Sequence, residues 1–382
     1  MALISVTAAA QEGFDSSRAS ADVGLSGVYT DNFYYGTDAE VRTSAMGAVL
    51  TPQAEYKAAK GKFNLLGSLA GEVGTFDTPG SADDYEDVNV NGAISWLATR
   101  RGRLDVRAGF ERRHDPFGIN RTENALVRDA DLDIWQATQA GMLFHYGSPE
   151  AVLNAEVGLS TMAKAYQTNE AQTRFLGYRA TAAQYALFYN IGPKTSVLFD
   201  FVRSNVSFEH EFTPVDTRAG NEYRVRTGLR WLASAKTSGD VRVGVYRRDF
   251  DQSTENEEGL DWEIGANWAP RARTLLELKS SRASQESYRT DTQVNLTRDV
   301  TAGWTQYWGA RTSSKLRVSR GESEFVGLGR TDSLYNVGLG VDRTLSQSLT
   351  VVMSVDSFSR TSNDSTSEFE RFIAYVGVRL GG

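Results

Sequence analysis

Apolar and polar residues alternate along most of this chain, in short segments that recur from Val23 to Leu380. Residues 260–268 show the alternation most clearly, because one set is apolar and the other is polar. The apolar set is Leu260, Trp262, Ile264, Ala266 and Trp268, and the polar set is Asp261, Glu263, Gly265 and Asn267. Successive side chains of a β-strand point to opposite faces, so this segment predicts a strand with one apolar and one polar face. Many such strands in one chain are typical of a transmembrane β-barrel.

The same pattern predicts about eighteen strands from residue 20 onward, an even number within the range of bacterial outer-membrane barrels. The predicted strands cover residues 21–30, 40–55, 61–75, 86–99, 102–113, 132–146, 151–164, 177–191, 195–208, 221–233, 239–250, 259–269, 273–284, 290–308, 314–323, 332–343, 348–360 and 368–380.

The predicted connections alternate between short and long. Tight links such as Gly147-Ser148-Pro149 follow the even-numbered strands, and longer polar segments such as 114–131 and 209–220 follow the odd-numbered ones. Short periplasmic turns and long extracellular loops give an outer-membrane barrel this asymmetry. The predicted fold is therefore all-β, a single transmembrane antiparallel barrel over residues 20–382. Residues 1–19, with Ala8-Ala9-Ala10 before Gln11, are expected to be a leader remnant or a flexible segment.

Composition is compatible with a barrel and excludes several other classes. The mean hydropathy is -0.39 and no apolar run reaches the roughly 20 residues of a membrane-spanning helix, but a barrel strand needs only alternate apolar residues. The chain has no Cys, which excludes disulfides and Cys-based metal sites. Its formal charge of -7 does not resemble that of a nucleic-acid binder. His114, His145 and His210 are scattered, so the sequence favours no enzyme, no metal and no cofactor.

Charge predicts which face of each strand meets water. An Arg or Lys on the lipid face near the membrane centre costs roughly 2–4 kcal/mol, so the charged faces should line the lumen. Arg298 interrupts an otherwise apolar row and is the exception. The residues predicted to line the lumen and the translocation path are Arg224, Arg226, Arg230, Arg242, Tyr246, Arg248, Asp261, Glu263, Glu277, Asp291, Gln293 and Asn295.

Two interpretations of these lumen charges remain open. Basic and acidic patches on neighbouring strands could guide a polar or anionic polymer, because arginine binds carboxylates in a fork. The same charges could instead pair across strands and support the wall. Similarly, the long loops could fold inward as constrictions, with Phe117, Asn120 and Phe212 as candidate residues, or remain solvated outside.

Several segments resemble the outer-membrane β-barrel porin type 2 family. They are Gly27–Phe33, Tyr223–Trp231, Val243–Phe250 and Trp262–Ser284. The resemblance covers most of the chain from residue 20, through diffuse patterns and without a signature motif. It implies a conduit for surface polysaccharide that works with periplasmic export proteins, and it brings no catalytic residues. Outer-membrane barrels commonly end in an aromatic residue that the barrel-assembly machinery recognises. This chain departs from that pattern, because it ends in Arg379-Leu380-Gly381-Gly382.

We therefore expect a channel in the outer membrane of a Gram-negative bacterium that translocates exopolysaccharide. The expected partners are outer-membrane lipid and lipopolysaccharide, the polysaccharide cargo, periplasmic polysaccharide-export proteins and the barrel-assembly machinery, with no nucleic acid. One alternative is a general or sugar-selective diffusion porin. Another is a structural or adhesion barrel with a closed lumen.

Overall fold

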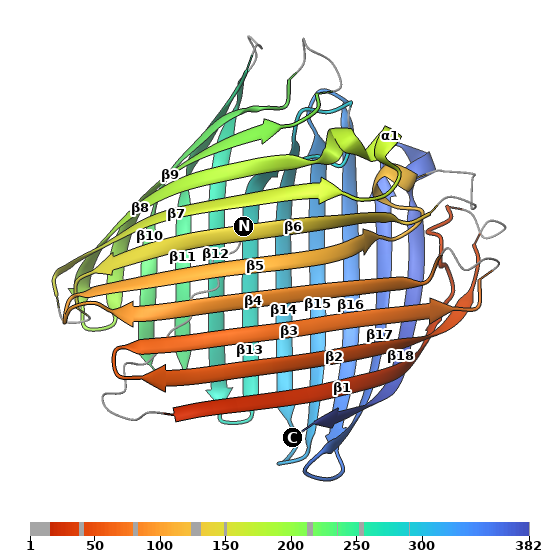
Figure 1. Cartoon of the computed structure of the whole chain (residues 1–382), viewed down its shortest axis with the longest axis horizontal. Coiled ribbons are helices and arrows are strands. Elements are labelled where there is room, and N and C mark those ends of the chain that lie inside the picture. Colours follow the sequence, from red (N-terminus) through yellow and green to blue (C-terminus); the bar gives the residue numbers. More distant parts are fainter. Residues whose placement is uncertain are drawn as a thin grey trace.

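Eighteen antiparallel strands form one closed barrel (Figure 1). The computed structural model describes residues 16–37, 42–78, 83–123, 131–148, 151–211, 217–234, 236–251, 256–289 and 291–381. The strands are β1 (Ser16–Thr30), β2 (Ala45–Lys60), β3 (Phe63–Phe76), β4 (Tyr85–Leu97), β5 (Gly102–Asp115), β6 (Asp133–Tyr146), β7 (Leu153–Tyr166), β8 (Tyr178–Gly192), β9 (Thr195–Phe208), β10 (Gly220–Ser234), β11 (Thr237–Phe250), β12 (Asn256–Arg271), β13 (Thr274–Gln285), β14 (Asn295–Tyr307), β15 (Thr312–Phe325), β16 (Arg330–Thr344), β17 (Leu349–Ser362) and β18 (Phe369–Gly381).

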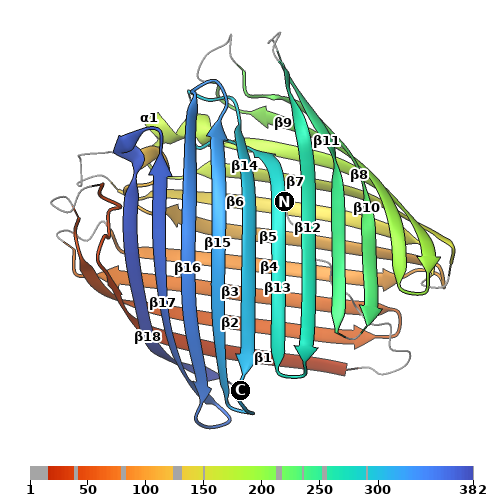
Figure 2. The same cartoon turned by 180° about the vertical axis from the view of Figure 1, so that it is seen from behind.

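The first and last strands close the barrel. Each strand pairs with its neighbours in the sequence, and β1 pairs with β18 from Asp22↔Gly381 to Thr30↔Ile373. Because these two strands pair with each other, neither β1 nor β18 presents a free sheet edge to lipid. Figure 2 shows β10 to β18 from the side opposite to that of Figure 1. The prediction of a single antiparallel barrel of about eighteen strands is confirmed.

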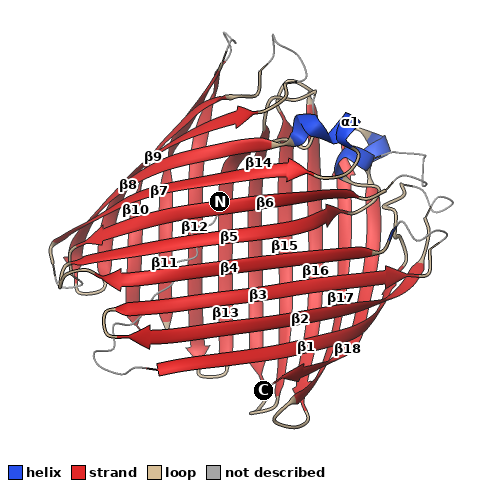
Figure 3. Cartoon of the chain, viewed as in Figure 1, coloured by secondary structure: helices blue, strands red, loops and turns tan. Residues whose placement is uncertain are grey.

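Short and long connections lie at opposite ends of the barrel. The links that follow even-numbered strands have two to six residues, and Gly61 in the β2–β3 link adopts a φ of 57° that favours glycine. The links that follow odd-numbered strands have four to seventeen residues. The helical turns lie in these longer loops, as Figure 3 shows for α1 (Glu170–Thr173). The long loops therefore define the extracellular end.

Large apolar side chains cover the outer surface of the wall. Leu25, Leu229, Val243, Leu260 and Val376 are 45–63% exposed, and many further apolar residues on the same faces are exposed as well. A soluble monomer rarely exposes a continuous apolar surface of this kind. Lipid is therefore the environment of this face. Within the described ranges, buried apolar residues form small clusters, such as Ala186, Phe188 and Leu198 on the inner face of β8 and β9.

Three strands differ most from their predicted ranges. Strand β1 begins at Ser16, because its first residues pair with the end of β2, as in Ser16↔Ala59. Strand β2 covers residues 45–60 instead of 40–55 for the same reason. The predicted strand 290–308 begins only at Asn295. Asp291 and Gln293 therefore lie in the loop before β14 and are not part of the strand wall.

Candidate functional site

The inner wall carries a connected series of ion pairs on β9 to β12. Arg226 on β10 binds Asp200 on β9 through two hydrogen bonds of 2.9 and 3.0 Å. Its Nη1 also lies 3.3 Å from both Asp261 and Glu263 on β12. Arg242 on β11 binds the second oxygen of Asp200 at 2.9 Å. One carboxylate on β9 thus holds guanidinium groups from two neighbouring strands.

The series continues toward β5. Arg242 and Arg230 both bind Asp240 on β11, at 2.7 and 2.8 Å. Arg230 also lies 3.8 Å from Glu156 on β7, which lies 3.1 Å from His145 on β6. His145 and Arg103 then share Asp105 on β5, at 2.8 and 3.1 Å.

We call this set the charge ladder. Its members are Arg103, Asp105, His145, Glu156, Asp200, Glu222, Arg224, Arg226, Arg230, Asp240, Arg242, Asp261 and Glu263. Five guanidinium groups and one imidazole in the ladder contact seven carboxylates. Every ladder arginine has a carboxylate partner, so the basic and acidic residues do not form two separate patches.

Several ladder residues are removed from water. The side chain of Asp200 is 0% exposed and those of Arg226 and Asp261 are 8% and 2% exposed, whereas Glu263 is 53% exposed. Removing one partner of a buried pair leaves an uncompensated charge, which costs far more than losing an exposed pair. The buried members are therefore structural, and Glu263 presents carboxylate to the lumen.

Within the ladder, Arg224 binds Glu222 at 2.6 Å and lies 3.7 Å from Asp261. Tyr246 and Arg248 have partners outside the ladder. Tyr246 donates to Glu257 at 3.1 Å. Arg248 is 2% exposed and binds Glu286 of the β13–β14 loop at 2.7 Å.

Three further predicted residues lie on β13, at the start of β14 and in the loop between these strands. Glu277 on β13 lies opposite Asn267 on β12, and Asn295 is 6% exposed at the start of β14. Asp291 forms two hydrogen bonds with Arg289 in its loop, at 2.8 and 2.7 Å, and this guanidinium lowers the pKa of Asp291.

A second group of ion pairs crosses the extracellular entrance. Glu123, in the β5–β6 loop, accepts two hydrogen bonds from Arg330 on β16, at 2.6 and 2.9 Å. It also binds Arg360 on β17 and lies 3.6 Å from Arg289 in the β13–β14 loop. The Glu123 side chain is 3% exposed. We call these four residues the entrance clasp, because they join a loop on one side of the barrel to strands on another.

The β9–β10 loop takes part in the same closure. Arg218 donates to the carbonyl oxygens of Phe175 and Arg289, which belong to two other loops. Burial lowers the pKa of Arg218 from its ordinary value. Phe117 in the β5–β6 loop is 6% exposed and its ring centroid lies 6.1 Å from that of Tyr34. Asn120 has a φ of 54° in that loop, while Phe212 lies outside the described residues. Contacts therefore join the loops over the entrance.

Residues 22–381 match the sequence model of a family described as Putative beta-barrel porin 2. The chain belongs to this porin family. No curated protein sequence matches the porin. Its family and its barrel place it in the outer membrane of a Gram-negative bacterium, and the family comprises porins and not enzymes.

Solved structures resemble the porin at low identity. OpdQ from Pseudomonas aeruginosa is 10% identical with a TM-score of 0.48, and the match covers 96% of the porin and 98% of OpdQ. The outer membrane protein opdK from the same organism is 12% identical with a TM-score of 0.46, over 96% and 99% of the two chains. The FrpB iron transporter from Neisseria meningitidis is 11% identical with a TM-score of 0.47, over 89% of the porin and 62% of FrpB. The porin thus spans less than two thirds of FrpB.

The sequence did not single out the clasp of this porin. Arg330 and Arg360 lie 207 and 237 residues from Glu123, so no local pattern relates them. Asp200 and Asp240 could have been found, because each lies on the polar side of a predicted strand. Among the described residues, no helix is long and apolar enough to cross a membrane and no group of acidic or His side chains could hold a metal.

Proposed function

We propose that the porin is a diffusion channel for small polar solutes that prefers cations to anions. The observation that supports this function is the charge ladder, in which carboxylates outnumber guanidinium groups and the most exposed side chain is that of Glu263. A passage whose lining carries a net charge concentrates ions of the opposite sign within it. Because every ladder arginine already binds a carboxylate, an anionic solute finds no free guanidinium group there.

The entrance clasp supports a limit on solute size. A barrel of this many strands is wide enough for an aqueous channel unless loops narrow it. Glu123 draws the β5–β6 loop onto β16 and β17, and Arg218 ties the β9–β10 loop to its neighbours. Small solutes pass such an entrance more readily than a polymer chain.

Planar bilayer recordings test the proposal. Purified porin should give steady conductance without any partner protein, and a salt gradient should give a reversal potential of the sign expected for a cation-preferring channel. Anion preference would contradict the proposed selectivity. A folded barrel without conductance would contradict the channel itself and would favour a structural or adhesion role.

Polysaccharide export is the second candidate function. It is supported by the inner faces of β14 and β15, which carry small hydroxyl residues at Thr297, Thr301, Thr305, Ser313, Ser319 and Ser323. Hydroxyl groups can exchange hydrogen bonds with sugar hydroxyls as a chain moves. Deletion of the gene should then reduce surface polysaccharide, and unchanged secretion would contradict this function.

A further inference from the structure

The wall of the barrel is incomplete between β12 and β13 at the extracellular end. Their ladder ends at Trp262↔Arg282, although β12 begins six residues earlier, at Asn256. Beyond Arg282, the described pairing of β13 is with β14 alone, from Ala283↔Thr297 to Gln285↔Asn295. Figure 2 shows the two strands separating toward this end. We call this opening the β12–β13 seam.

The end of β13 closes the seam on its lumen side. Ser284 donates to Glu222 on β10, and Glu286 binds Arg248 on β11 at 2.7 Å. Both Glu222 and Arg248 lie on inner faces, so the chain crosses behind β12. The seam is therefore a groove that opens toward the membrane and has a floor of protein.

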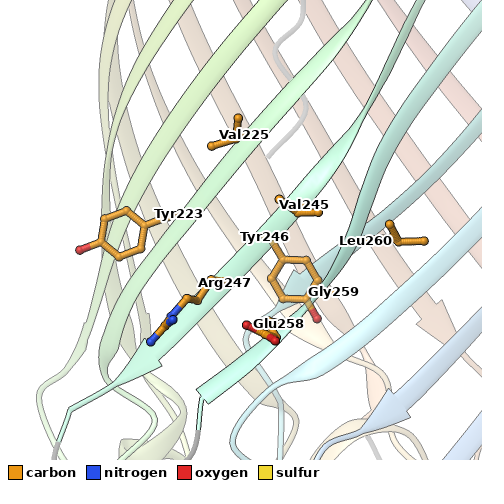
Figure 4. Close-up of a pocket in the computed structure, with 8 residues that line it drawn as sticks. All are labelled: Tyr223, Val225, Val245, Tyr246, Arg247, Glu258, Gly259 and Leu260. Carbon is orange, nitrogen blue, oxygen red and sulfur yellow. The ribbon is translucent and has the colours of Figure 1, made fainter.

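Two pockets share Leu260, and the smaller one lies at this groove. One has a volume of about 570 Å³ and is lined by residues of β10 to β12 that include Val225, Val245 and Leu260 (Figure 4). The other, of about 340 Å³, is lined by Leu260, Trp262, Arg282 and Arg298. The apolar lining suits a hydrocarbon chain.

Arg282 lies between the two pockets. Its Nη1 donates to the carbonyl oxygen of Leu260 on the unpaired edge of β12, and its guanidinium lies 5.6 Å from the ring centroid of Tyr246, which lines the larger pocket. Its Nε is buried and has no hydrogen-bond partner among the described residues. This donor of the cation is therefore unsatisfied within the described part of the protein.

The charges around Arg282 do not explain its position. It stands directly opposite Arg298 in the β13–β14 ladder. Like charges directly opposite each other destabilise a sheet. Arg298 binds Glu322 at 2.8 Å and Arg247 binds Asp249 at 2.6 Å, while Glu258 lines the larger pocket. Among the described residues, no carboxylate oxygen lies within 4.0 Å of the Arg282 guanidinium. An anion near both Arg282 and Arg298 would remove this cost.

We propose that the β12–β13 seam binds a phosphorylated lipid of the outer leaflet. The phosphate lies at Arg282 and Arg298, and an acyl chain packs against Leu260 and Trp262, which line the same pocket. The seam faces the membrane at the extracellular end, where the head groups of the outer leaflet lie. Basic pockets in membrane-facing walls bind lipid head groups by the same combination of charge and apolar surface.

Lipid binding by the purified full-length porin tests this site. The probe is bis-phosphorylated lipid A, measured by native mass spectrometry in detergent against dephosphorylated lipid A. Loss of two arginine–phosphate contacts in R282Q/R298Q should weaken binding by about 30-fold. R320Q is the matched control, because Arg320 lies on the membrane-facing side of β15 outside the groove and should change binding by less than about twofold.

Two results would overturn the proposal. One is equal binding of lipid A to the wild type and to the double variant, with both proteins shown to be folded by their shift on unboiled gels. The other needs no variant: if the wild-type porin binds dephosphorylated lipid A as tightly as lipid A, phosphate is not the group that the seam recognises. Inorganic phosphate should displace lipid A only weakly, because it lacks an acyl chain. Full displacement of lipid A by inorganic phosphate would show that the apolar groove is not part of the binding site.

Discussion

Arg226 and Asp200 form a two-pronged ion pair inside the wall: Nε lies 2.9 Å from Oδ1 and Nη2 lies 3.0 Å from Oδ2. Asp200 also binds Arg242, so its carboxylate neutralises two cations at once. Asp200→Ala should lower the free energy of unfolding by about 3–5 kcal/mol, because it leaves buried guanidinium groups without a partner. Denaturant unfolding in lipid vesicles measures this change.

An exposed ion pair provides the control for Asp200. Arg247 and Asp249 lie 2.6 Å apart with side chains 54% and 41% exposed. Asp249→Ala should cost less than about 1 kcal/mol. Equal losses in the two variants would contradict the structural role of the ladder.

The entrance clasp should control conductance. Glu123→Gln removes the charge that holds Arg330 and Arg360, so the β5–β6 loop should move outward and single-channel conductance should rise. Planar bilayer recording measures the change. Glu170→Gln, at an exposed acid of α1, should leave conductance as in the wild type.

Charge selectivity should depend on Glu263. Its side chain is 53% exposed on the lumen side of β12, so Glu263→Gln should reduce the preference for cations in a reversal-potential measurement. Glu258→Gln alters the opposite face of the same strand and serves as control. A larger shift for Glu258 than for Glu263 would contradict the proposed path.

The two faces of the wall should differ in their tolerance of arginine. Val243 is 47% exposed toward lipid, so Val243→Arg should destabilise the inserted barrel by up to about 2–4 kcal/mol. Ser319→Arg, on the lumen side of β15, should insert normally. The fraction that migrates as folded barrel on unboiled gels compares the variants.

Acid should loosen the β13–β14 loop. Arg289 lowers the pKa of Asp291, so their pairing stabilises the loop above the ordinary pKa of aspartate, about 3.9, and the gain is lost as pH falls through the lower folded value. The pair is partly exposed, so the effect should be below about 1 kcal/mol. The open probability of the wild-type channel should rise slightly below about pH 4. Asp291→Asn should not show this rise.

The strands were predictable because alternation is local. Leu229 and Arg230 are adjacent, and their difference in polarity predicts that they point to opposite faces of the strand. In the structure, Leu229 is exposed on the lipid-facing side and Arg230 binds Asp240 on the inner side. Boundaries such as Asn295 depend on neighbouring strands, which sequence does not locate. The clasp and the seam depend on residues brought together from distant segments, so only the closed structure reveals them.

The pairing of Val23 with Leu380 also sets the order in which this protein can be completed. The first strand acquires its second neighbour only after the last has been synthesised and delivered to the membrane. Until then, one edge of β1 must be shielded by something other than the chain itself. Loss of β18 would leave one edge of β1 and one edge of β17 unpaired.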